Sequence, residues 1–98
     1  MTIINGKPYS KFDLHVHTAE TSKCGIVAAT ELVTAYKAAG YDGFTITDHL
    51  HEGYISLQNC RDDWQECITR YLFGYQEAKR LGEQIGFTVA LGVELRFP

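Results

Sequence analysis

Three short stretches of the chain alternate apolar and polar residues, and each of them predicts a β-strand. They span about residues 11–16, 44–47 and 87–93. Successive side chains of a strand point to opposite faces of its sheet, so the alternation assigns every residue to a face. We expect the apolar faces to pack against covering helices and the more polar faces to lie on the other side of the sheet.

Helical periodicity fills the chain between the predicted strands. A helix is expected over residues 29–39, followed by Gly40, and its apolar stripe consists of Leu32, Val33 and Tyr36. A longer helix is expected over residues 61–85, ended by Gly86. Its continuous apolar stripe, which should face the sheet, consists of Trp64, Cys67, Ile68, Tyr71, Leu72, Tyr75, Ala78, Leu81 and Ile85.

The resulting order is β-α-β-α-β, which predicts an α/β fold with a parallel sheet and right-handed crossovers. Gly74 and Gly82 lie inside the longer predicted helix and weaken it without breaking it. Residues 1–10 form a lead-in with a turn at Asn5-Gly6.

Composition narrows the class of protein. The chain has 98 residues, of which 45% are hydrophobic and 21% charged, so we expect one soluble globular domain. A net charge of −3 gives no basic surface for gripping nucleic acid. No apolar run is long enough to span a membrane, and the first residues lack the apolar core of a signal peptide, so the expected location is cytoplasmic.

The three cysteines are Cys24, Cys60 and Cys67. Their number is odd, no CxxC pair occurs, and a reducing compartment is expected, so disulfides are not predicted. Cys60 and Cys67 suit packing thiols of the longer helix. Cys24 lies in a loop near two histidines and is a minor candidate for a metal ligand.

Each predicted strand leads into a candidate metal ligand. His15 and His17 end the first strand, His49 follows the second, and Glu94 follows the third. By alternation these residues share the less apolar face, and the carboxyl ends of parallel strands meet at one edge of a sheet. Imidazole and carboxylate ligands suit zinc, manganese or iron, and the residue types do not choose among them. For the two histidines alone, an ordinary strand with surface histidines is the alternative.

Four neighbouring residues are weaker candidates. Asp13 falls on the face of the two strand histidines and is placed to accept the spare ring N–H of a ligating histidine. Asp48 falls on the face opposite His49 and is interpreted as an orienting acceptor. Glu20 is either a ligand that closes over the site or a solvated loop acid, and His51 is a minor ligand candidate in a loop.

The chain resembles the PHP (polymerase and histidinol phosphatase) family. The stretch Asp13-Leu14-His15-Val16-His17-Thr18 is similar to its first motif, Thr47-Asp48-His49 to its second, and Gly92-Val93-Glu94 to the segment with its glutamate ligand. The resemblance implies a distorted seven-stranded (β/α), TIM-like barrel that holds up to three divalent ions. It also implies hydrolysis of phosphoesters such as histidinol phosphate, nucleotides or nucleic-acid ends.

The resemblance also implies roles for individual residues. His15, His17 and Glu94 would hold one ion, with Glu94 bridging to a second ion and His49 serving a third. The family commonly has an Asp or His in the loop after the first motif. Residues 21–25 differ from that pattern, which leaves Glu20 as the substitute.

The resemblance ends near the third strand of seven. Residues 1–98 are therefore interpreted as the amino-terminal portion of a single PHP-type phosphoesterase domain, and the family's later ligands would lie downstream. Alone, the chain is expected to bind metal weakly, to be inactive, and to associate through exposed sheet edges. A small phosphorylated substrate is the expected partner. The alternatives are an amidohydrolase-type hydrolase and a non-catalytic metal-binding PHP module attached to a polymerase.

Overall fold

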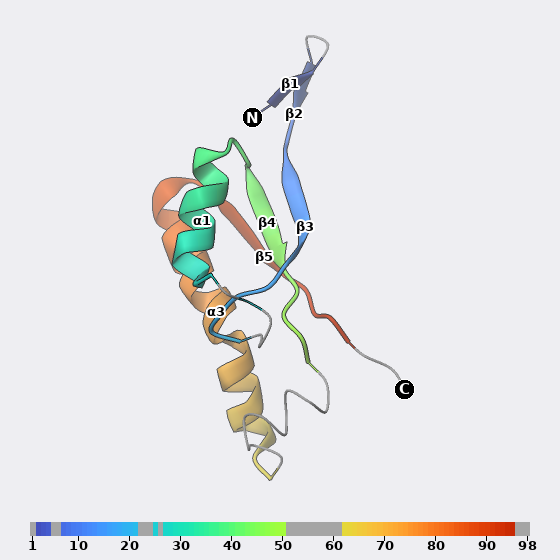
Figure 1. Cartoon of the computed structure of the whole chain (residues 1–98), viewed down its shortest axis with the longest axis vertical. Coiled ribbons are helices and arrows are strands. Elements are labelled where there is room, and N and C mark those ends of the chain that lie inside the picture. Colours follow the sequence, from blue (N-terminus) through green and yellow to red (C-terminus); the bar gives the residue numbers. More distant parts are fainter. Residues whose placement is uncertain (1, 5–6, 22–24, 26, 51–61, 96–98) are drawn as a thin grey trace.

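The computed structural model describes residues 2–4, 7–21, 25, 27–50 and 62–95. Strands β1 (Thr2–Ile4) and β2 (Lys7–Tyr9) pair antiparallel, with Ile4 opposite Lys7, on either side of the predicted turn. The turn residues Asn5 and Gly6 lie outside the described residues. This hairpin projects from the end of the molecule away from the candidate site (Figure 1).

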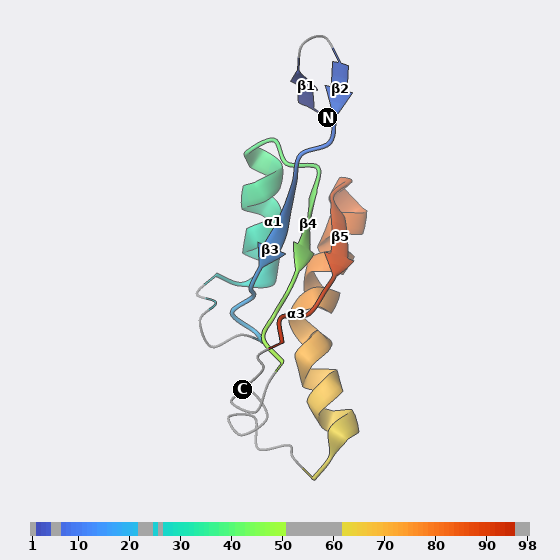
Figure 2. The same ribbon diagram turned by 90° about the vertical axis from the view of Figure 1, so that its right-hand side faces the viewer.

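Three parallel strands in the order β3-β4-β5 form the main sheet. They are β3 (Phe12–Val16), β4 (Gly43–Ile46) and β5 (Thr88–Leu91). Helices α1 (Ala29–Ala38) and α3 (Trp64–Ile85) connect them. Both helices lie on the same side of the sheet, and Figure 2 shows the strands in front of them. The predicted β-α-β-α-β order is confirmed, and it is compatible with the start of a TIM-like fold.

The helices begin and end for local reasons. Asp63 caps α3 by accepting the backbone N–H of Glu66 at 3.0 Å. Gly86 ends α3 with a φ of +74°, and Gly40 follows α1 with a φ of +89°. These left-handed conformations favour glycine, which explains why the sequence located both ends.

The core lies between the helices and the covered face of the sheet, where Val33, Phe44, Ile46 and Ala78 are buried with Val16, Ala29, Phe87 and Val89. The predicted stripe of α3 is only partly right. Cys67, Tyr71 and Ala78 are buried, but Trp64 is 57% and Ile85 37% exposed. Gly74 and Gly82 belong to the buried face, where the helix approaches its neighbours too closely for a side chain.

The predicted face assignment of the first strand is wrong for Asp13. The pairing of β3 with β4 shifts between Asp13, which lies opposite Phe44, and Val16, which lies opposite Ile46. Between these pairs, two residues of β3 therefore lie opposite one residue of β4, as in a β-bulge. Asp13 consequently lies on the helix side, where its carboxylate accepts the hydroxyl of Tyr36 at 2.7 Å.

The bulge also leaves apolar residues of the first strand uncovered. Leu14 is 72% and Phe12 40% exposed, whereas Val16 is buried. The expectation that all three pack against helices is therefore correct only for Val16. In the second strand the alternation holds, because Phe44 and Ile46 are buried on the helix side.

Cys67 is disulfide-bonded, so the prediction that the cysteines form no disulfide is wrong for this residue. Cys24, Cys60 and His51 lie outside the described residues, and so does the start of the predicted longer helix at 61.

In the described part of the chain, neither helix is long and apolar enough to cross a membrane.

Candidate metal site

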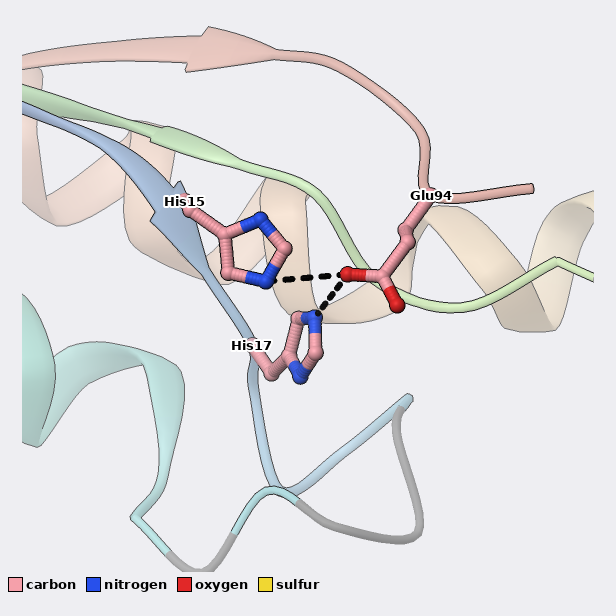
Figure 3. Close-up of side chains that lie close together, drawn as sticks. All are labelled: His15, His17 and Glu94. Carbon is pink, nitrogen blue, oxygen red and sulfur yellow. Dashed lines mark hydrogen bonds and ion pairs between the residues drawn. The ribbon is translucent and has the colours of Figure 1, made fainter. Parts of the chain in front are cut away.

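His15, His17 and Glu94 meet at the carboxyl ends of the parallel strands (Figure 3). The Nε2 atoms of His15 and His17 lie 2.9 Å and 3.1 Å from the same carboxylate oxygen, Oε1 of Glu94. One donor atom from each of the three residues lies within 4.8 Å of the other two. The predicted convergence of residues 77 positions apart in the sequence is thus present in the fold.

His49 joins this group from the second strand. Its Nδ1 atom lies 2.9 Å from Oε2 of Glu94, the carboxylate oxygen that the other two histidines do not contact. Its ring centroid lies 4.3 Å from that of His17, which in turn lies 4.8 Å from that of His15. The Glu94 carboxylate therefore contacts His49 through one oxygen, and His15 and His17 through the other.

Backbone hydrogen bonds continue past the strand ends and bring these segments together. His49 and Glu94 form an isolated parallel bridge, in which the N–H of Leu50 donates to the carbonyl of Glu94 at 3.0 Å. The N–H of Thr47 donates to the carbonyl of Val16 at 2.8 Å. Because backbone pairing continues past the strand ends, the side chains of the ligand candidates gather at one end of the sheet.

The group is open to solvent on one side and enclosed on the other. The side chain of His15 is 65% exposed, whereas that of His17 is 16% exposed. Partial burial of Glu94 raises the pKa of its carboxyl, but the hydrogen bond with His17 and the charges of His49, His17 and His15 outweigh this effect and lower the pKa below its usual value. The carboxylate is therefore ionised and available as a ligand at neutral pH.

The donor atoms fit a divalent transition ion. Zinc binds histidine nitrogen and carboxylate oxygen at about 2.0–2.2 Å, so neighbouring donors of a tetrahedral site lie about 3.4 Å apart. The observed separations of 2.9 Å and 3.1 Å, with all donor atoms within 4.8 Å, bracket that value.

Two aspartates support this site through the backbone. Asp13 accepts the backbone N–H of His15 at 3.0 Å, so the prediction that it accepts a ring N–H is wrong. Its carboxylate instead bonds the backbone within the bulge, which contains His15. Asp48 lies opposite His49, as predicted, and is buried, where its carboxylate accepts both the N–H and the hydroxyl of Thr18.

The structure does not bring Glu20 to the cluster. Both of its carboxylate oxygens accept the N–H of Ala29, at 2.9 Å and 3.1 Å, at the amino terminus of α1. Ala28, the residue that would ordinarily cap this helix, offers no side-chain hydrogen bond. Glu20 therefore serves as a cap from a distance, where its charge also suits the helix dipole.

Sequence reasoning missed the residues that pack beneath the site. Thr18 is fully buried, and Tyr71 donates its hydroxyl to the carbonyl of Asp48 at 2.6 Å. The sequence does contain one indication of this packing, namely Gly74, which weakens the helix and lies on its buried face. A glycine there indicates close approach of another segment, in this case Thr18.

A family model described as "PHP domain" matches residues 13–98 of the chain. The match begins at Asp13, includes all four clustered residues and covers most of the sequence. No curated protein and no solved structure matches the chain significantly.

Proposed function

The chain belongs to the PHP domain family, and on that premise we propose that it carries part of the site of a metal-dependent phosphoesterase. The family includes metal-dependent phosphoesterases. The observation that supports the proposal best is the convergence of His15, His17 and Glu94, whose donor atoms lie within 4.8 Å of one another. We further propose that residues 1–98 are the amino-terminal portion of such a domain.

The proposed ligands divide around one carboxylate. His15, His17 and Glu94 would hold one ion, and Glu94 would bridge to a second. His49, whose Nδ1 faces Oε2 of Glu94, would serve a third ion. Zinc, manganese and iron all suit these ligands. When bound, such an ion polarises a phosphoryl oxygen and lowers the pKa of water near it. The chain itself contributes by holding the three imidazoles around the Glu94 carboxylate and by keeping that carboxylate ionised.

A small phosphorylated molecule is the proposed substrate. The exposed side of His15 leaves room for an anionic group to approach the site from solvent. The net charge of −3 does not favour a long nucleic acid, because phosphate backbones are gripped mainly by clustered cations. We also propose a cytoplasmic location.

The proposal is tested by incubating the protein with a generic phosphomonoester and Mn²⁺ or Zn²⁺. We expect no substantial turnover by these residues alone, because the three-stranded sheet of the described residues leaves the site open. Metal-dependent binding of inorganic phosphate, followed by calorimetry, is therefore measured in parallel. Phosphate binding and any residual turnover should be lost in the His15→Ala/His17→Ala variant.

Two alternative activities have distinct outcomes in the same experiment. Hydrolysis of an amide or lactam without any phosphoester activity or phosphate binding would favour an amidohydrolase-type enzyme. Metal binding without phosphate binding would favour a non-catalytic metal-binding module. Phosphoester turnover that is unaffected by a chelator would contradict the proposed use of a metal.

A further inference from the structure

Asp48 connects the chain segments that carry the clustered residues. Its side chain is buried, with 1% exposed. Oδ1 accepts the backbone N–H of Thr18 at 2.7 Å, and Oδ2 accepts the Thr18 hydroxyl at 2.8 Å. The backbone carbonyl of Asp48 accepts the N–H of Glu94 at 3.1 Å. Because Thr18 directly follows His17 and Asp48 directly precedes His49, this one residue contacts or adjoins three of the segments.

Helix α3 also contacts the segments that Asp48 connects. The hydroxyl of Tyr71 donates to the carbonyl of Asp48 at 2.6 Å, and the hydroxyl of Thr21 donates to the carbonyl of Tyr71 at 3.1 Å. A Cβ atom at Gly74 would lie 2.2 Å from Oγ1 of Thr18, a separation that real Cβ atoms do not reach. The glycine therefore provides the space in which Thr18 meets Asp48.

We propose that Asp48 is a positioning residue for the metal site, acting through Thr18 and through its own backbone carbonyl. The inference rests on the proposed function, because it assumes that the neighbouring histidines and Glu94 hold a divalent ion. Ligand distances in a metal site are expected to lie within about 0.2 Å of standard values, so the spacing of the ligand segments matters. A buried carboxylate that bonds two ligand segments holds their spacing more firmly than exposed side chains do.

A direct deletion of the carboxylate, Asp48→Ala, would leave two buried donors of Thr18 without acceptors and endanger folding. Two matched pairs of milder variants avoid this difficulty. In the first pair, Thr18→Val has the shape of threonine without its hydroxyl, whereas Thr18→Ser keeps the hydroxyl. The second pair places a methyl group in α3, at Gly74 beneath the site or at Gly82 far from it.

Gly82→Ala is a suitable control because its methyl group also meets an obstacle. A Cβ atom there would lie 2.4 Å from the carbonyl oxygen of Phe87, near the other end of the sheet. Both alanine variants should therefore lose stability, but only Gly74→Ala should disturb Thr18. Stability is measured by denaturant unfolding, and affinity by titration with Co²⁺, whose visible absorption also reports the coordination geometry.

We expect Thr18→Val and Gly74→Ala to lower the Co²⁺ affinity of the folded protein by about 10- to 100-fold and to alter its absorption spectrum. Thr18→Ser and Gly82→Ala should bind Co²⁺ much as the wild type does. Wild-type affinity and spectrum in Thr18→Val and Gly74→Ala would overturn the inference, as would an equal loss in Gly82→Ala. Failure of the proposed function itself is distinguishable, because the wild type would then bind Co²⁺ no better than His15→Ala/His17→Ala.

Discussion

At the scale of single residues, Glu94 is the centre of the site because its two carboxylate oxygens face different histidines. Burial raises the pKa of this carboxyl, but the hydrogen bond with His17 and the charges of the three histidines lower the pKa overall, which favours the ionised, ligating form. Glu20, in contrast, is engaged at the amino terminus of α1. The two glutamates therefore have different roles: Glu94 faces the histidine side chains, whereas Glu20 binds a backbone N–H of α1.

The position of Glu20 leads to a prediction about stability. Replacing it by Ala should lower the free energy of unfolding by about 0.5–2 kcal/mol, the usual cost of losing a helix cap. Because Glu20 contacts Ala29 and not the histidines, metal affinity should not change. Denaturant unfolding and a metal titration check the two parts. Loss of metal affinity with unchanged stability would show that Glu20 is a ligand.

At the scale of elements, α1 is joined to β3 by the hydrogen bond from Tyr36 to Asp13. Burial, the hydrogen bond to Asp13 and the charges of Asp13 and Tyr41 raise the pKa of Tyr36 from 10.0 to about 12. A pKa that is higher in the folded state stabilises the fold fully below the unfolded value. That stabilisation is lost as the pH rises from 10.0 to about 12.

The predicted result is a pH-dependent difference between the wild type and Tyr36→Phe. The difference between their free energies of unfolding should be constant below pH 10.0 and should move against the wild type between pH 10.0 and about 12. Denaturant unfolding at several pH values measures it. A difference that stays flat throughout this range would contradict the contact between α1 and β3.

The elements themselves were predictable because each follows a simple period. Two-residue alternation placed His49 and Glu94 on one face, and glycines with positive φ marked both helix ends. The bulge in β3 was not predictable, because it is a feature of the pairing of β3 with β4, which lies later in the chain. The site was therefore recognisable from strand ends and motifs, whereas its support by Asp13 and Asp48 required the tertiary fold.

At the scale of the whole molecule, the two helices cover one face of the sheet and no described element covers the other (Figure 1). At the end of β5 and just after it, Leu91, Val93 and Leu95 are 45%, 45% and 51% exposed. Together with α3 they line a hollow of about 370 Å³ that is mainly apolar. An exposed apolar surface of this kind favours contact with another apolar surface.

We therefore predict that the chain associates with itself as its concentration rises. The Leu91→Lys/Leu95→Lys variant should associate less, because two charges would be desolvated in the contact. Sedimentation velocity over a range of concentrations measures both proteins, and the metal titration serves as a control for folding. A wild type that sediments as a monomer at every concentration would contradict this prediction.

Metal content is the most direct measurement of the central claim. Wild type, His15→Ala/His17→Ala and Glu20→Gln are each loaded with Zn²⁺ or Mn²⁺, freed of unbound ion and analysed for metal by mass spectrometry. Glu20→Gln is the matched control, because it removes a nearby carboxylate that lies outside the cluster. We predict metal in the wild type and in Glu20→Gln, and loss of most of it in the double variant. Equal metal content in the wild type and the double variant would show that His15 and His17 do not form a metal site.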